Sequence, residues 1–390
     1  MDSVWSDVMR IGLGLGIAMQ KMPPSFMPGL SNANATGGYA ANCAGSLLAY
    51  APNTLRWGCL DGKRAVLVEA GATNILPGQT HVSNTMTGGS QFAQVPFPSV
   101  RIFTAPAGTG GRYAYCLSKF SAVAGSTYTV SAWVVSSERY VTILGGSDAF
   151  GTDKYAVVDV IDGAVIHAVG CTASVTKMLG MCRVTMTTTA SATTAAGSYG
   201  VAVSDGSNNR IPSIVTDGTE TLTVFGGQVE AGSAATSYIP TSGAATTRAA
   251  DLVTAPITAD VSGGVRVRGT FRLDAVKGGY DRVFQLDNGS NDNRMFLLWD
   301  AASSKFQIGL YNGNVGQGFV LFDGPALGDL IEFDLTYTPA SITGMFNGVP
   351  VSKSLSGGYT PPTTARLGSI PIGTSVPARL LCSEFLVTGV

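Results

Sequence analysis

Charged side chains are scarce in this sequence. Only 13% of the 390 residues are Asp, Glu, Lys or Arg, and the 24 basic and 25 acidic side chains leave a formal net charge of −1. Without a basic field to attract phosphate groups, the chain is not expected to bind nucleic acid. A surface with so few charges is either buried against other subunits or coated by Ser and Thr, and the composition leaves both alternatives open.

Histidine is rarer still, and the cysteines lack the spacing of a metal site. The two histidines are His81 and His167, and none of the six cysteines forms a Cys-x-x-Cys pair. The sequence therefore predicts no zinc site, no haem and no cofactor. No Gly-x-Ser-x-Gly elbow accompanies the histidines, so nucleophilic hydrolysis is not expected. An assembly made in a cytoplasm would keep all six cysteines reduced, although the spacing of Cys43 and Cys59 allows them to pair.

Long hydrophobic runs are also missing. The apolar segment 11–17 alternates Gly with aliphatic residues and is too short to span a bilayer. Asp2 and Asp7 argue against a secretory signal. Three apolar residues near the start of the chain have helix-like spacing: Trp5, Val8 and Ile11. We interpret them as an anchor that orders when it docks on a larger particle, and the alternative is a frayed terminus.

Glycine, by contrast, is abundant, with 50 residues. So many glycines indicate many tight turns, and the dominance of Thr, Val, Ser and Ala without Glu/Lys-rich stretches favours an all-β protein. A chain of this length also exceeds one typical core, so more than one domain is expected. Asp-Gly and Asn-Gly pairs, which suit hairpin turns, occur at Asp162-Gly163, Asn288-Gly289, Asn312-Gly313 and Asn347-Gly348.

Apolar and polar residues alternate in several segments, which is the pattern of half-buried strands. The apolar faces are Tyr128, Val130, Ala132 and Val134; Cys182, Val184 and Met186; Val265, Val267, Phe271 and Leu273; and Ile331, Phe333, Leu335 and Tyr337. At 128–134 the face that carries Trp133 is the alternative core face. The sequence thus predicts an all-β fold of two tandem antiparallel β-sandwiches, preceded by a short N-terminal segment.

Three runs near the middle of the chain carry a family resemblance. They are Gln228-Val229-Glu230-Ala231-Gly232, Thr236-Ser237-Tyr238-Ile239-Pro240-Thr241 and Thr247-Arg248-Ala249-Ala250-Asp251. This stretch resembles phage structural proteins, the fibres and spikes in which such runs end a β-sandwich. Glu69, Thr73 and Asn74 match the pattern that precedes the sandwich in those proteins, whereas Gly71-Ala72 departs from the expected Gly-Ala-Arg order.

The resemblance implies a division of the chain into four parts. The order of pieces within 65–252 is similar to the carbohydrate-binding jelly rolls of phage fibres, and Phe346-Asn347-Gly348-Val349 resembles a hairpin of concanavalin A-like and laminin-G-like sandwiches. The expected parts are a loop-rich attachment segment (1–62), a jelly-roll sandwich (63–240), a linker (241–254) and a concanavalin A/laminin-G-like sandwich (255–390). Tyr238 and Ile239 are expected to pin the linker to a sandwich.

Some concanavalin A-like folds are glycanases, and the segment Glu332-Phe-Asp334-Leu-Thr336 bears on that possibility. Retaining glucanases of this fold carry Glu-x-Asp-x-Glu on one strand face, and threonine replaces the last carboxylate here. Because glycoside hydrolysis needs two flanking carboxylates, we interpret the segment as a solvated strand face and predict no enzyme. A turn containing Asp287 and Asp292 is a weak calcium candidate, and a plain Asn/Asp turn is the favoured alternative.

Sugar binding requires an exposed aromatic platform beside hydrogen-bonding groups. The candidates are Trp133, Tyr140 and Tyr155 in the first sandwich and Trp299, Tyr311 and Phe319 in the second. Most aromatic residues of a sandwich lie in its core, so each candidate has a core residue as its alternative interpretation. Trp133 faces away from Tyr128 and Val130, which favours an outward position.

The resemblance implies a non-enzymatic component of a phage or phage-like particle: a fibre, spike or decoration protein that attaches to host-surface polysaccharide. The protein would belong to a virion assembled in the host cytoplasm and would contact other virion proteins through its N-terminus. Symmetry implies a homo-oligomer, a trimer as in many fibres or a pentamer at a capsid vertex. The alternatives are a structural decoration or baseplate protein without a ligand, and a polysaccharide-degrading enzyme.

Overall fold

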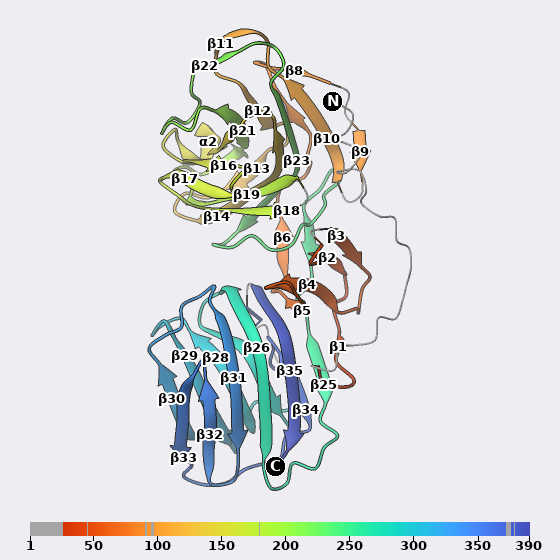
Figure 1. Cartoon of the computed structure of the whole chain (residues 1–390), viewed down its shortest axis with the longest axis vertical. Helices are drawn as coiled ribbons and strands as arrows, with labels where there is room; N and C mark the ends of the chain where they lie inside the picture. Colours follow the sequence, from red (N-terminus) through yellow and green to blue (C-terminus); the bar gives the residue numbers. More distant parts are fainter. Residues whose placement is uncertain are drawn as a thin grey trace. The chain divides into compact units, whose positions relative to one another are not determined.

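The computed structural model describes residues 26–44, 46–89, 92–94, 97–178, 180–371, 376–377 and 379–390. Within these ranges the chain is almost entirely β, and the α-helix is the four-residue α2 (Ser147–Phe150). The prediction of an all-β fold built from antiparallel sheets is confirmed (Figure 1). No helix of the described ranges has the length and apolar character needed to cross a membrane.

The chain divides into two compact units, and the first comprises residues 72–248. One of its sheets contains, in spatial order, β18 (Thr172–Met178), β19 (Met181–Thr189), β14 (Thr127–Ser136), β23 (Thr221–Ala231), β10 (Phe97–Thr104) and β8 (Thr87–Gly88), with β9 (Phe92–Gln94) also paired to β10. The other contains β17 (Ala164–Val169), β16 (Tyr155–Asp159), β15 (Tyr140–Gly145), β21 (Tyr199–Ser204), β12 (Tyr113–Cys116) and β7 (His81–Val82). Three short pairs complete the unit: β11 (Gly108–Gly110) with β22 (Ile214–Thr216), β13 (Phe120–Ala122) with β20 (Thr194–Gly197), and β6 (Ala72–Asn74) with β24 (Thr246–Arg248).

The core of the first unit lies between its two large sheets. It contains Tyr128, Val130, Ala132 and Val134 of β14 and Cys182, Val184 and Met186 of β19. The opposite sheet contributes Val141, Ile143 and Val201, among others. Alternation along each strand therefore places one apolar face against the other, as expected of a β-sandwich.

The second unit comprises the described residues of 26–71 together with 249–390. One sheet contains, in spatial order, β1 (Ser31–Asn32), β25 (Val253–Pro256), β34 (Thr364–Leu367), β27 (Tyr280–Asp287), β28 (Arg294–Asp300), β29 (Lys305–Asn312) and β30 (Val315–Phe322). The other contains β33 (Val349–Ser354), β32 (Ser341–Phe346), β31 (Leu330–Tyr337), β26 (Val265–Ala275), β35 (Arg379–Gly389), β5 (Lys63–Val68) and β4 (Arg56–Leu60). A hairpin of β2 (Gly38–Ala41) and β3 (Leu47–Tyr50) adjoins them. The predicted core faces of β26 and β31 are buried between the sheets.

The predicted domain boundaries are wrong at the N-terminal side. Residues 26–62 were expected to attach the chain to a particle, yet β1 pairs with β25 and β4 pairs with β5 inside the second unit. β5, expected to open the first sandwich, pairs with β35 instead. Its residues are apolar on both faces because Val66 and Val68 join the sandwich core, while Ala65 and Leu67 pack in a second cluster with Leu60 and Leu381.

The segment expected to be a linker, 241–254, is also part of the two units. Within it, β24 pairs with β6 in the first unit, and β25 begins at Val253 in the second. Tyr238 and Ile239, just before it, are buried as predicted, with Tyr238 packed on Phe97 at a ring-centroid distance of 5.0 Å. A Gly/Ala/Ser/Thr-rich composition thus does not exclude ladder pairing when the backbone can supply all the contacts.

All four predicted hairpin turns connect antiparallel strands. Asp162-Gly163 lies between β16 and β17, and the three Asn-Gly turns lie between β27 and β28, β29 and β30, and β32 and β33. Asn347 and Gly348 have φ values of 48° and 79°, as a type I′ turn requires at both central positions. The chemistry of this turn therefore sets the register of β32 and β33.

One disulfide, Cys43–Cys59, joins the loop between β2 and β3 to β4. The sequence leaves open whether Cys43 and Cys59 pair, and the structure joins them. Cys116, Cys182 and Cys382 are buried thiols, and Cys171 is half-buried.

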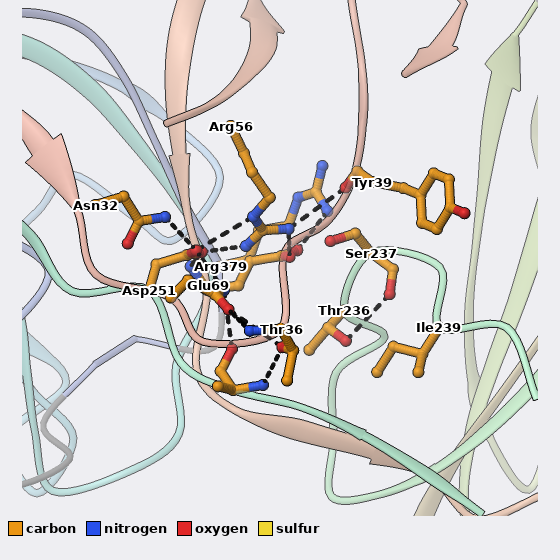
Figure 2. Close-up of polar contacts among 12 residues, drawn as sticks. Asn32, Thr36, Tyr39, Arg56, Glu69, Thr236, Ser237, Ile239, Asp251 and Arg379 are labelled. Carbon is orange, nitrogen blue, oxygen red and sulfur yellow. Dashed lines mark hydrogen bonds and ion pairs between the residues drawn. The ribbon is translucent and has the colours of Figure 1, made fainter. Parts of the chain in front are cut away.

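A buried ion cluster ties the N-terminal strands to the rest of the second unit (Figure 2). Arg56 Nη1 lies 2.8 Å from Glu69 Oε2, and the same guanidinium binds Asp251 through Nη2 and through Nε at 3.2 Å. Asn32 Nδ2 donates to Asp251 Oδ1 at 2.8 Å, and Arg379 Nη1 lies 2.9 Å from Glu69 Oε1. Glu69 and Asp251, two of the residues that carry the phage resemblance, therefore have a structural role here.

Candidate functional site

The structure buries three of the six aromatic candidates for sugar binding. Trp133, Trp299 and Tyr155 keep only 2%, 7% and 9% of their surface exposed. A ring this deeply buried offers no face to a sugar, so these three assignments are wrong. Trp299 belongs to the core of the second unit, where its ring meets Phe306 edge-on at 4.9 Å.

Trp133 faces away from the core of the first unit, as its alternation with Val130 and Val134 predicts, but the outer face of its sheet is covered there. Phe97 and Phe225 pack near the indole, and the Tyr238 ring packs on Phe97. The Arg183 guanidinium lies 5.9 Å from the indole centroid. Trp133 is consequently part of a second, smaller apolar layer.

Tyr140 and Tyr155 do not form a platform in the first unit. The Tyr155 hydroxyl donates to the Asn208 backbone oxygen at 3.1 Å, and its ring packs in a small cluster with Leu144 and Val157. The half-exposed Tyr140 ring lies against the backbone of Gly206, where an added Cβ would be 3.0 Å from it.

Tyr311 and Phe319, in contrast, come together on the outer face of the second unit. Their ring centroids are 5.2 Å apart, and both side chains are half-buried. Phe296 lies beside them, with its centroid 6.2 Å from Tyr311 and 6.3 Å from Phe319. The three rings belong to β28, β29 and β30, whose core-facing residues include Leu297, Ile308 and Phe322.

Strand register and one glycine explain how the rings meet. Phe296 pairs with Gly309, and Gly309 pairs with Phe319, so the three residues lie in one row across the sheet. A Cβ on Gly309 would lie 2.5 Å from Phe319 Cδ1 and 2.7 Å from Phe296 Cζ. Because Gly309 has no side chain, the rings of Phe296 and Phe319 can pack together above its backbone.

Two arginines complete this cluster, which we call the aromatic–arginine patch: Arg282, Arg294, Phe296, Tyr311 and Phe319. The Arg294 guanidinium lies 3.8 Å from the Tyr311 centroid, and that of Arg282 lies 4.9 Å from the Phe296 centroid. Each distance suits a cation–π contact. The sequence did not single out Arg282, Arg294, Phe296 or Gly309 as site residues. The alternation of Arg294 and Phe296 with Met295 and Leu297 nevertheless indicates that Arg294 and Phe296 share the outer face of their strand.

Burial controls the electrostatics of the patch. Burial and, after it, repulsion by Arg294 lower the pKa of Arg282 to about 10. Burial likewise lowers the pKa of Arg294. Both guanidinium groups remain charged at neutral pH, but each is held where its charged form is less well solvated than in water.

Hydrogen-bonding groups surround the Arg294 end of the patch. Thr360 Oγ1 donates to Asn312 Oδ1 at 2.6 Å, and the Gly313 backbone N–H donates to Asn293 Oδ1 at 2.8 Å. Arg294 Nη1 donates to the Asn291 backbone oxygen. The patch thus combines apolar rings with amide and hydroxyl groups, which are the two components that sugar recognition uses.

The calcium candidates lie in the turn next to this patch, but they do not form a site. Asp287 is buried and its Oδ2 accepts from Arg366 Nε at 2.8 Å, whereas Asp292 is exposed. The charge of Asp287 is therefore already balanced by a guanidinium. Across the described residues, no group of three or more His, Cys, Asp or Glu side chains is placed to hold a metal ion.

A second surface feature, the charged groove, lies on the outer face of the opposite sheet of this unit. It has a volume of about 340 Å³ and is lined by Arg268, Gly269, Thr270, Glu332, Phe333, Asp334, Met345, Gly348 and Glu384. Arg268 Nε lies 3.3 Å from Glu384 Oε1, and Arg266 Nε donates to Asp334 Oδ1 at 2.7 Å. The interpretation of Glu332 and Asp334 as an outer strand face is confirmed.

Asp334, one of the carboxylates of the groove, lacks the signature of an acid catalyst. The hydrogen bond from Arg266 lowers the pKa of Asp334, which is the opposite of what a general acid near neutral pH needs. Glu332 and Glu384 flank Thr270 on adjacent strands and point to the same face. The groove can accept polar groups, and its rims carry no exposed aromatic ring among the described residues.

Trp5, Val8 and Ile11, the predicted particle anchor, lie outside the described residues. His81, expected in a polar loop, is buried and its Nε2 lies 2.8 Å from the Tyr199 hydroxyl. His167 is half-buried in β17.

Comparisons with known proteins give only coarse likenesses. No protein-family model and no curated protein sequence matches the chain. Among solved structures, domains LG4–5 of the mouse laminin α1 chain are 11% identical with a TM-score of 0.27, and the match covers 72% of this chain and 86% of that one. A Trypanosoma rangeli sialidase in complex with sialic acid is 10% identical with a TM-score of 0.29, over 86% of this chain and 60% of that one. Likenesses this distant carry no argument about function, and the phage resemblance stays a prediction.

Proposed function

We propose that this chain is a non-enzymatic attachment protein that binds glycans through the aromatic–arginine patch. The observation that carries the proposal is the meeting of Tyr311 and Phe319 on an outer sheet face, with Arg294 and several amide groups beside them. An aromatic ring packs against the apolar face of a pyranose, while the amides and the guanidinium bind its hydroxyl groups. The charged groove, which lacks such rings, fits a sugar less well.

A glycan array probed with the full-length chain tests the proposal. We expect binding to bacterial surface polysaccharides that falls at least about tenfold, or ~1.4 kcal/mol, in Tyr311→Ala and in Phe319→Ala. Leu321→Ala is the matched control, because Leu321 is an exposed apolar residue of the same strand as Phe319. Trp133→Ala and Trp299→Ala are unsuitable probes, since both rings are buried. Absence of binding to every glycan would instead favour a structural decoration or baseplate role.

The charged groove favours one alternative function, the degradation of a polysaccharide, and the same polysaccharides can test it. Glu332 and Glu384 flank Thr270 on one face, so a polysaccharide-degrading activity would place its carboxylates there. Release of reducing ends from a polysaccharide by the wild-type chain, and its loss in Glu332→Gln, would support that rival. We expect no release.

We further propose, from the sequence resemblance, that the protein is a fibre, spike or decoration protein of a phage or phage-like particle. Residues 26–62 build the second unit, so the attachment role is proposed for residues 1–25, which include Trp5, Val8 and Ile11. Deleting 1–25 should leave a folded homo-oligomer, a trimer or pentamer, that no longer joins the particle. Particle proteomics and sedimentation of the two forms would test both statements.

A further inference from the structure

The two arginines of the patch lack the counter-ions that other arginines of the same unit have. Arg282 keeps only 8% of its surface exposed. Its Nε donates to Gln285 Oε1 at 3.1 Å. Its Nη1 is buried without a hydrogen-bond partner among the described residues, and so is Nε of Arg294. Neither guanidinium forms an ion pair within the described part of the chain.

Neighbouring arginines show that the unit can provide such partners. Arg366, on the adjacent strand β34, pairs with Asp287 at 2.8 Å, and Arg379 pairs with Glu69 at 2.9 Å. Asp287 is also the register partner of Arg294, yet its carboxylate receives hydrogen bonds from Arg366 and from Gln285 Nε2 at 3.1 Å. Asp287 and Glu69 therefore neutralise other arginines, and the positive charge of Arg282 and Arg294 has no carboxylate partner among the described residues.

An uncompensated, partly desolvated cation pair creates a preference for an anion. Bringing a carboxylate to a guanidinium forms charge-assisted hydrogen bonds, which are about twice as strong as neutral ones. The surrounding rings of Phe296, Tyr311 and Phe319 lower the local polarity, which strengthens the attraction. The acidic group that acts on Arg294 is Asp292, and it is exposed to water, which screens it.

Resting on the glycan-binding function proposed above, we infer that the aromatic–arginine patch selects sugars that carry a carboxylate, the uronic acids. The half-buried Arg294 contacts the carboxylate, and Arg282, behind it on the adjacent strand β27, adds its charge to the field at that point. The Tyr311 and Phe319 rings, 5.2 Å apart, hold the apolar face of the same sugar or of the next one. The rings give affinity for a pyranose, and the arginines give the selection for an acidic one.

Paired oligosaccharides test the inference with the full-length chain. The probes are oligomers of galacturonate, glucuronate and mannuronate, each beside its carboxyl-reduced neutral form, together with an O-sulfated neutral oligomer. We expect at least one uronate to bind about tenfold or more tightly than its reduced form. Arg294→Gln should weaken binding of the uronate about tenfold more than binding of the reduced form, so that the difference disappears, and Arg294→Lys should retain part of it.

Arg64→Gln is the matched control, because Arg64 also lies over an aromatic ring, Trp57 at 3.8 Å, without an ion pair among the described residues. It should leave the preference intact. A second variant, Arg282→Met, should reduce the preference for the uronate while thermal unfolding confirms that the chain is folded.

The outcomes separate the two proposals. Equal binding of a uronate and its reduced form, lost in Tyr311→Ala, would overturn the selection for carboxylates and leave glycan binding in place. Binding of the sulfated oligomer with no preference for any uronate would also overturn it. No binding of any probe or of any arrayed glycan would overturn glycan binding itself, and the inference with it.

Discussion

At the scale of single residues, His81 couples the stability of the first unit to pH. Its imidazole is fully buried, and burial lowers its pKa from 6.5 to about 4. Between these values the unfolded chain binds a proton that the folded chain does not. The contribution of His81 is therefore fully present above pH 6.5 and is lost as the pH falls toward 4, on the order of 3 kcal/mol in total.

Replacement of this histidine should flatten the acid side of the stability profile. In His81→Gln, the free energy of unfolding should fall less between pH 6.5 and pH 4 than it does in the wild type, because the titrating group is gone. Urea unfolding at several pH values, followed by a probe in the first unit, measures the difference. His167→Gln, at a half-buried position, should keep the wild-type slope. Parallel profiles for wild type and His81→Gln would contradict the assignment.

Arg56 makes the largest single contribution that we predict for the second unit. Arg56→Met would leave Glu69 and Asp251 as buried carboxylates without their shared guanidinium. Removing one partner of a buried ion cluster costs about 3–5 kcal/mol. Arg266→Met, which breaks an exposed pair with Asp334, should cost about 1 kcal/mol or less. Denaturant unfolding of both variants decides the matter, and similar losses in the two would refute the structural role of the cluster.

At the scale of elements, the row Phe296–Gly309–Phe319 across β28, β29 and β30 holds the patch together. Gly309→Ala would place a Cβ within 2.5 Å of Phe319, so that ring must rotate away. We expect glycan affinity to fall about tenfold, with a stability loss of about 1–3 kcal/mol from overpacking. Gln307→Ala, two residues earlier on the same outer face, should change neither by as much. Unchanged binding in Gly309→Ala would show that the rings do not act as a unit.

Strand faces and turns of this molecule could be predicted from local pattern, because they depend on local chemistry. The alternation in β14, β26 and β31 identifies the core side, and the Asn-Gly pairs fix the hairpins. Coverage of an outer face cannot be predicted this way. The alternation along β14 places Trp133 on the outer face of its sheet, but Phe97 and Phe225, which are distant in sequence, cover it there.

The candidate site shows the same limit. Tyr311 and Phe319 could be singled out because they are aromatic residues, and sugar binding requires an aromatic platform. Their pairing with Phe296 and the two arginines depends on which strands lie side by side and on a glycine between the rings. Sheet order is a long-range property, so the patch could not be assembled from the sequence.

At the scale of the whole molecule, the second unit is discontinuous in sequence. Its sheets take β1, β4 and β5 from before the first unit and the other large-sheet strands from after it. Phe26, Trp57, Val66 and Val68 from the early segment belong to the same core as the later strands. The first unit, 72–248, is therefore inserted within the second, and the ion cluster of Arg56, Glu69 and Asp251 joins the two separated pieces of the second.

This insertion predicts how fragments of the chain should behave. Residues 72–248 contain both sheets of the first unit and should unfold cooperatively on their own. Residues 255–390, the sandwich expected from the sequence, should not, because they lack β5 beside β35 and leave buried side chains of that sheet exposed. Heating each fragment while recording circular dichroism tests this, and adding a peptide of residues 26–71 should restore a transition to 249–390. A cooperative transition of 255–390 alone, at the unfolding temperature of the intact chain, would contradict this. It would mean that β1, β4 and β5 are not required for the second sandwich to fold.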